Sequence, residues 1–308
     1  MKTYLKPILA TAIFILLASA SFAQNVLVDV TKNYSNISVI EVEGGWLAVK
    51  YEGGSGPDVS VDAFLKSNDD DQDIVFVTVG DVLKIKFERK RNNYSWNNSN
   101  EGYIHITGPS DMKVDIKNSS GSIYVAKLRS EETNISVSSG KVKAQDIDGN
   151  LMIKATSGNL QVDGVSGDVI AGLTSGNADL VDIKGNADFK ATSGSLDAKN
   201  IGGKLNVQFT SGNAKLENIG ELGRLKFTSG NIRAENAGLG SETSFSGTSG
   251  SFRVQTPSNL KNFNYDLKAS SGSVKVGSTS GGKTLKIDNN AESWIEGSIS
   301  SGRISIEN

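Results

Sequence analysis

The sequence predicts an all-β fold, a β-solenoid whose coils each take about 18 residues. Glycine recurs every nine residues from Gly149 to Gly212, and every other one closes a Thr-Ser-Gly tripeptide, at Gly158, Gly176, Gly194 and Gly212. Apolar and polar residues alternate between these glycines, which is the pattern of a strand with one buried face. A repeat of fixed length indicates one structural unit stacked on copies of itself.

The first residues have the pattern of a secretory signal peptide. Lys2 and Lys6 precede an uncharged apolar run over residues 8–20, and Ser21-Phe22-Ala23 places small residues just before Gln24. We therefore expect residues 1–23 to be cleaved and the chain to be exported. Its destination would be the periplasm, the outer-membrane surface or the extracellular space. No later segment is apolar and long enough to be a predicted membrane span.

Composition narrows the class of protein. The chain has 32 basic and 34 acidic residues, a net charge of −2, whereas nucleic-acid binders are usually strongly basic. It has no cysteine, so neither disulfides nor thiol chemistry is available. Its 34 glycines and four prolines suit many tight turns between strands. We expect a monomeric β protein that does not bind nucleic acid.

Residues 24–105 are less regular than the repeat. The sequence predicts five strands there, bounded by turn residues, at 37–42, 47–51, 59–64, 74–79 and 82–87. Gly80-Asp81 between the last two is typical of a hairpin turn. This part forms either irregular N-terminal coils and a cap of the solenoid or a small separate β-subdomain, and we favour the first.

Residues 106–308 form the predicted repeat domain. An antiparallel meander of hairpins would show the same glycine spacing, but it would expose the apolar column Val165, Ile183, Ile201 and Ile219. A solenoid corner turns that column inward, which favours the solenoid. Stacked corners would also align threonines and asparagines in ladders, as repeated side chains do elsewhere. The repeat degenerates toward both ends, where we expect irregular caps; Trp294 and residues 304–306 would form the C-terminal one.

From about Gly102 onward the chain resembles a family of exported, adhesin-like proteins with β-strand repeats, a domain of unknown function (DUF4097-like). The hallmark of that family is an alternating strand followed by Ser-Gly-x-apolar, repeated along the chain. Three segments carry the resemblance: Tyr103-Ile104-His105-Ile106 leading to Pro109, Met112-Lys113-Val114-Asp115-Ile116, and Ser119-Ser120-Gly121-Ser122-Ile123. The resemblance implies a single-stranded, right-handed parallel β-helix in the envelope of a bacterium. It brings no established catalytic residues.

The sequence offers no catalytic, cofactor or metal site. The one histidine, His105, lies between Ile104 and Ile106, so it faces away from the core and no triad or multi-histidine site can be assembled around it. The repeat lacks the turn aspartate of calcium-binding β-rolls. The acidic run at 69–73 could hold one hard cation, although a solvated loop is the better interpretation.

One cluster of aromatic and basic residues lies outside the core pattern. We predict ligand binding by Trp46, Arg91, Tyr94 and Trp96, because exposed aromatic rings stack on sugars and cations suit an anionic glycan. The alternative is a surface loop whose tryptophan packs back as a cap. If these aromatic residues do not converge on one exposed patch, this site prediction fails.

The predicted function is a non-catalytic exported β-solenoid, an adhesin-like or envelope scaffold protein that presents a long polar face to a glycan or protein partner. A polysaccharide lyase or hydrolase is the alternative, since outward carboxylates such as Asp163, Asp179 and Asp197 are plentiful. A periplasmic partner of a membrane regulatory complex fits the predicted export equally well.

Overall fold

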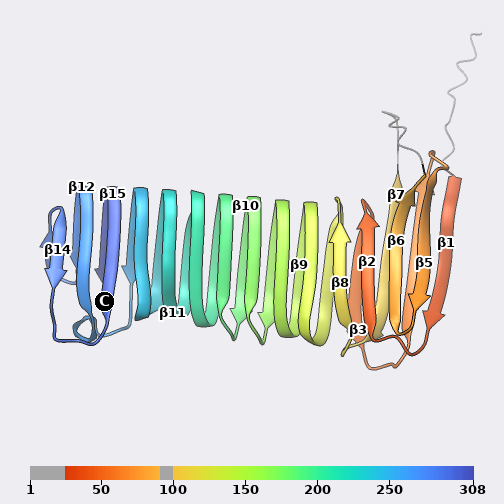
Figure 1. Ribbon diagram of the computed structural model, residues 1–308, viewed down its shortest axis with the longest axis horizontal. Helices are drawn as coiled ribbons and strands as arrows, with labels where there is room; N and C mark the ends of the chain where they lie inside the picture. Colours follow the sequence, from red (N-terminus) through yellow and green to blue (C-terminus); the bar gives the residue numbers. More distant parts are fainter. Residues whose placement is uncertain (1–24, 91–99) are drawn as a thin grey trace, which may run out of the picture.

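The computed structural model describes residues 25–90 and 100–308, and in this part the chain is almost entirely β-strand. The strands form one 15-stranded sheet that winds into an elongated stack of coils (Figure 1). The one short helix in these ranges is a 3-10 turn, η1, at Leu260–Asn262. The described ranges contain no helix that is long and apolar enough to cross a membrane. The predicted signal peptide, residues 1–23, lies outside them.

The central coils pair in parallel, as the repeat predicts. They consist of β9 (Ser122–Val165), β10 (Val169–Ile183) and β11 (Ala187–Gln255), of which β9 and β11 are long enough to run through several turns. Val169 of β10 pairs with Leu151 on one side and Ala187 on the other, each 18 residues away. Successive coils therefore lie directly on one another in chain order, as Figure 1 shows from yellow to teal.

The interior of the coil is a continuous apolar core. Ile183 and Ile201, which a hairpin meander would expose, pair with each other and are each 1% exposed, so that alternative is wrong. Large and small side chains alternate along the stack, as close packing requires. Aromatic rings fill it toward the C-terminal half, where Phe227 stacks on Phe252 with ring centroids 4.4 Å apart.

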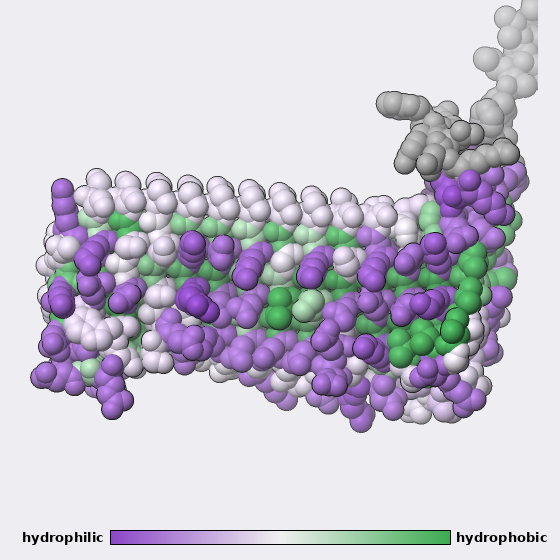
Figure 2. All heavy atoms as spheres, viewed as in Figure 1, coloured by the Kyte–Doolittle hydropathy of each residue, from purple (hydrophilic) through white to green (hydrophobic). Residues whose placement is uncertain are grey.

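Glycines in the Thr-Ser-Gly turns are fixed by contact between neighbouring coils. Gly176 has φ +136°, and a Cβ placed there would lie 1.8 Å from the carbonyl oxygen of Gly158 on the preceding coil. Any side chain would push the coils apart at this corner, and the backbone conformation is one that L-residues rarely adopt. These turns form the pale band of small residues along the upper edge of Figure 2.

A second corner uses asparagine in the left-handed region. Asn200, Asn218 and Asn236 have φ of 57°, 56° and 50°, a conformation that asparagine tolerates better than most residues. Their side chains form a ladder: Asn218 Nδ2 donates to Asn200 Oδ1, and Asn236 Nδ2 donates to Asn218 Oδ1, both at 2.9 Å. The ladder satisfies the amides along the axis of the solenoid. It is a second ladder, besides the asparagines predicted to stack beside the Thr-Ser-Gly turns.

The N-terminal end is built from eight strands and is not purely parallel. Their bounds are β1 Asn25–Tyr34, β2 Val39–Gly45, β3 Ala48–Gly54, β4 Val59–Ser67, β5 Gln72–Val79, β6 Val82–Arg89, β7 Glu101–Pro109 and β8 Lys113–Asn118. The pairs β1–β4, β4–β7 and β5–β6 are antiparallel, which corrects the expectation of a parallel helix throughout. Of these pairs only β5–β6 is a hairpin, with the two-residue turn Gly80-Asp81 between Val79 and Val82.

Two early strands are inserted out of sequence order. β2 pairs in parallel with both β6 and β8, and β3 pairs in parallel with both β7 and β9. Residues 39–54 therefore lie inside the stack, between segments that follow them in the chain. β1 and β5 each pair on one side only, and Val77 and Val79 of β5 are 47% and 60% exposed. This end carries much of the apolar surface in Figure 2.

The C-terminal end has the same kind of insertion. It comprises β12 (Asn264–Val276), β13 (Thr279–Gly281), β14 (Thr284–Ile287) and β15 (Trp294–Glu307). β15 pairs in parallel with β11 on one side and β12 on the other, so the last strand lies within the stack (Figure 1). The prediction that this strand caps the solenoid is wrong. β12, β13 and β14 end the stack, because both backbone edges of β15 are already paired.

Candidate binding groove

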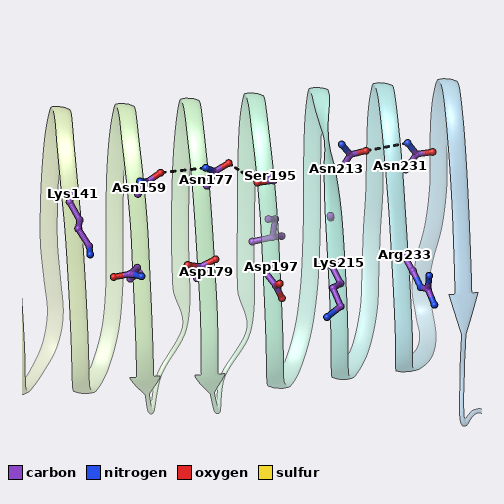
Figure 3. Close-up of a pocket in the computed structure, with 13 residues that line it drawn as sticks. Lys141, Asn159, Asn177, Asp179, Ser195, Asp197, Asn213, Lys215, Asn231 and Arg233 are labelled. Atoms are coloured by element: carbon purple, nitrogen blue, oxygen red, sulfur yellow. Dashed lines mark hydrogen bonds between the residues drawn. The ribbon is translucent and has the colours of Figure 1, made fainter.

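A shallow groove of about 610 Å³ runs across the central coils, on the face that follows each Thr-Ser-Gly turn. Alternation along each strand builds it: Leu196 and Ala214 turn inward and form part of the floor, while their neighbours point to solvent. The outward side chains form two rows along the solenoid axis (Figure 3). These lining residues are Lys141, Asn159, Gln161, Asn177, Asp179, Ser195, Asp197, Asn213, Lys215, Asn231 and Arg233.

The row nearer the Thr-Ser-Gly turns begins with Lys141 and continues with short amide and hydroxyl side chains. Ser195 Oγ donates to Asn177 Oδ1 at 2.6 Å, and Asn231 Nδ2 donates to Asn213 Oδ1 at 3.1 Å. Asn177 Nδ2 also donates to Asn159 Oδ1, at 3.5 Å (Figure 3). These bonds hold the amides in one orientation, so donors and acceptors repeat at the spacing of the coils, roughly 4.8 Å. An ordered polar row of this kind can bind a ligand that repeats along its own length.

The second row is charged and changes sign along the groove. Asp179 and Asp197 are register partners on adjacent coils, and both are exposed. The next two coils place Lys215 and Arg233 in the same row. Arg233 forms an ion pair with Glu235 at 2.6 Å. Apart from the neutral Gln161 this row is charged, and Lys141 stands at the N-terminal end of the other row. The groove is therefore acidic at its middle and basic toward both ends.

The model of the Toastrack DUF4097 family matches residues 34–218 and again residues 203–307. The chain belongs to the Toastrack family. This confirms the resemblance drawn from the Ser-Gly repeats, and the family's domain is one of unknown function. No curated protein matches the sequence.

Three solved structures align with nearly the whole Toastrack chain at low identity. A candidate cell adhesion protein from Clostridium sporogenes is 12% identical, with 91% of this chain and 99% of that one covered and a TM-score of 0.27. A candidate lipid binding protein from Parabacteroides distasonis is 14% identical, with 90% and 95% covered and a TM-score of 0.35. A candidate adhesin from Bacteroides fragilis is 11% identical, with 91% and 96% covered and a TM-score of 0.33. The family assignment therefore rests on the family model.

Of the four binding residues predicted from sequence, the structure describes one. Trp46 lies at the N-terminal end of the Toastrack stack, packed edge-on against Phe87 with ring centroids 5.8 Å apart. Its Nε1 donates to Gln72 Oε1 at 3.3 Å, and the residue lines a separate shallow hollow with Phe87 and Lys117. Arg91, Tyr94 and Trp96 lie outside the described residues, so the convergence of these aromatic residues stays a prediction.

Two further sequence candidates have ordinary structural roles. His105 is exposed on β7, as predicted, and its ring stacks on Tyr103 with centroids 4.2 Å apart. Partial burial lowers the pKa of His105 below its usual value, against the opposing charge of Asp62. In the acidic run, Asp69 forms an ion pair with Arg89, and hydrogen bonds from that guanidinium lower the pKa of Asp69. The described residues include no group of three or more potential metal ligands.

Sequence reasoning recognised the outward charged face of the repeat but did not locate the groove on it. The groove lies between the residues one position and three positions after each turn glycine, both of which point to solvent. A comparison of that position alone, from coil to coil, shows the change from Asp179 and Asp197 to Lys215 and Arg233. The pattern was therefore present in the sequence, in a column rather than in a contiguous motif.

Proposed function

We propose that this Toastrack protein is a non-catalytic, exported, adhesin-like protein of the cell envelope that binds a glycan in the groove. Residues 24–105 would form the N-terminal coils or cap, and residues 106–308 the rod that carries the groove. The signal-peptide pattern of residues 1–23 supports export. We also take the coil as right-handed, since crossovers between parallel strands of one sheet are right-handed in about 98% of cases.

The observation that carries this proposal is the amide and hydroxyl row of the groove. Asn159, Asn177, Ser195, Asn213 and Asn231 repeat once per coil, and each presents hydrogen-bonding groups to solvent. A linear glycan repeats its hydroxyl groups at a similar interval, so successive sugars can meet equivalent side chains. Each contact is weak by itself, but contacts on several coils add along a single chain. A long, open and polar groove suits such a polymer better than a small enclosed ligand.

A glycan array tests the proposal, with the wild-type protein and two matched variants. Ser195→Ile replaces a hydroxyl in the groove with a bulky side chain, on a strand position that isoleucine favours. Ser193→Ile makes the same change two residues earlier on the same coil, at an exposed turn position that does not line the groove. We expect Ser195→Ile to abolish binding and Ser193→Ile to retain it. Equal binding by both variants would show that the groove is not the site.

Asp179 and Asp197 give a specific reason to test the enzymatic alternative. As register partners on adjacent parallel strands they lie roughly 5 Å apart at the backbone. Retaining glycosidases place two carboxyl groups about 5–5.5 Å apart. The same glycans should therefore be assayed for reducing ends and unsaturated products. Turnover that is lost in Asp179→Asn would establish a carbohydrate-active enzyme, whereas binding without products supports the adhesin-like function.

A further inference from the structure

A second hollow, of about 440 Å³, continues the groove at its C-terminal end and is rich in arginine. Arg233 lines both spaces, so a polymer that follows the groove reaches the second hollow directly. The other cations that line it are Arg253 of β11 and Arg303 of β15. All three arginines are exposed. The hollow thus collects three guanidinium groups on three successive coils.

The stacking of the coils places these arginines side by side. Gly250 lies on Gly230, and Gly302 lies on Gly250, since a Cβ on either would meet the carbonyl oxygen of the coil beneath at 1.7 or 1.8 Å. Arg233 and Arg253 each follow their turn glycine by three residues, and therefore lie in one column. Like charges on directly opposed strand positions repel each other.

The inserted strand β15 opens the space between the cations. At the position that matches Arg253, β15 carries Ser305, and at the position that matches Ser251 it carries Arg303. A short side chain thus takes the place of a long one in the column, which leaves a depression beside Arg253. Gln255 and Asn308 add polar groups to its lining.

Two of the three guanidinium groups, those of Arg253 and Arg303, form no ion pair within the described residues. Arg233 pairs with Glu235, and the other acid of the hollow, Glu307, pairs with Lys275 at 3.1 Å. Ser305 Oγ also donates to Glu307 at 2.7 Å, and the hydrogen bonds from Ser305 and Lys275, with a smaller attraction from Arg303, lower the pKa of that carboxyl. Among the described residues, Arg253 has no ion pair, and Arg303 Nε donates to the neutral Ser273 Oγ at 3.2 Å. Their charge is available to an external anion.

We infer that the ligand of the groove is an acidic polysaccharide, one of whose carboxylate or sulfate groups binds between Arg253 and Arg303. The planar guanidinium donates two parallel hydrogen bonds to either anion, which makes arginine the preferred side chain for both. The anion would also relieve the repulsion between the stacked arginines. The inference rests on the proposed function, and it specifies the charge of the glycan.

The test compares three polymers, and vesicles of anionic phospholipid, for binding to the full exported chain by biolayer interferometry. Polygalacturonate carries carboxylates, dextran sulfate carries sulfates, and dextran is neutral. The double variant Arg253→Gln/Arg303→Gln removes both unpaired charges at exposed positions. Arg224→Gln is the matched control, because Arg224 is exposed on the same β11 strand and lines neither hollow.

We expect at least one acidic polymer to bind, with affinity that falls as salt rises, and dextran to bind weakly or not at all. Loss of both arginines should weaken binding by about tenfold per arginine, which is about 1.4 kcal/mol for each charge-assisted contact. Arg224→Gln should bind like the wild type. Preference for one acidic polymer then identifies the anion as carboxylate or sulfate.

Three outcomes would overturn the inference. Equal binding of dextran and the acidic polymers would leave the glycan proposal standing while removing the role of charge. Binding of acidic polymers that the arginine variant does not weaken would place the anion elsewhere. Binding confined to anionic phospholipid vesicles, and lost in the arginine variant, would assign the hollow to lipid. If no glycan of any charge binds the wild type, the proposed function itself fails.

Discussion

The substitution Gly176→Ala should destabilise the solenoid far more than its size suggests. Real Cβ atoms essentially never come within 3.0 Å of another heavy atom, yet this one would lie 1.8 Å from Gly158 O. The two coils must therefore separate by roughly an ångström, which weakens about one or two backbone hydrogen bonds at about 1 kcal/mol each. The φ of +136° adds about 1–3 kcal/mol of backbone strain for any L-residue. We expect a loss of about 2–5 kcal/mol in the free energy of unfolding.

Gly172→Ala provides the matched control. Gly172 lies four residues earlier in the same strand, and a Cβ there would meet nothing within 4 Å. Alanine at such a position usually raises stability slightly, by about 0.4–1 kcal/mol, because it restricts the unfolded chain. In thermal melts followed by circular dichroism, the melting temperature of Gly176→Ala should therefore be roughly 10 °C below that of the wild type. The melting temperature of Gly172→Ala should be unchanged or slightly higher. Melting temperatures for the two variants within about 2 °C of each other would refute the reasoning.

Three further predictions concern the ion pairs, the corner ladder and the core. Hydrogen bonds from Lys127 and Lys50 lower the pKa of Glu52 to about 2. Its stabilising effect is therefore complete above the unfolded pKa of about 4.3, and is lost as pH falls through the folded value. At pH 7, Glu52→Gln should reduce the free energy of unfolding by less than about 1 kcal/mol and so lower the melting temperature slightly. Near pH 2, the melting temperatures of the variant and the wild type should be the same. Asn218→Ala should lower the free energy of unfolding, measured with urea, by about 2 kcal/mol. The variant loses the two hydrogen bonds of the ladder, and alanine is strained in the left-handed conformation of this corner. Asn218→Gly should cost less; equal losses would show that the backbone conformation is not what asparagine supplies. Phe252→Ala, beside two other phenylalanines in the core, should cost about 3–5 kcal/mol in the same assay, and a loss under about 1 kcal/mol would contradict the packing.

The sequence allowed prediction of the coil because every local feature agrees with it. The spacing of Gly158 and Gly176, the inward column of Ile183 and Ile201, and the polar residues between them all require the same geometry. The order of the coils in the stack could not be predicted in this way. Any coil with a Ser-Ser-Gly turn presents the same backbone edge as any other such coil. The local pattern therefore does not show that β15 stacks between β11 and β12 instead of beyond β12. Only packing over the whole chain decides that order.

The candidate site was missed for a related reason. Sequence reasoning looked for aromatic and basic residues that are close in the chain, and so selected Trp46 and the segment from Arg91 to Trp96. The groove instead joins residues that are 18 apart, one from each coil, and none of them is unusual in its own segment. In a solenoid the binding surface lies across the repeats, so candidate sites are better sought by position within the repeat than by neighbourhood in the sequence.

The insertion of β15 connects the fold to the proposed site. Arg253 and Arg303 are fifty residues apart in the chain, and they share a hollow only because β15 pairs with β11. The intervening β12, β13 and β14 must then stack outside β15, on the edge that it presents. In a solenoid that simply continued in chain order, β12 would take that place and the position beside Arg253 would carry Lys275 instead of Ser305. A long cation there would fill the depression. The out-of-order strand therefore both closes the end of the stack and creates the anion-binding space that we propose.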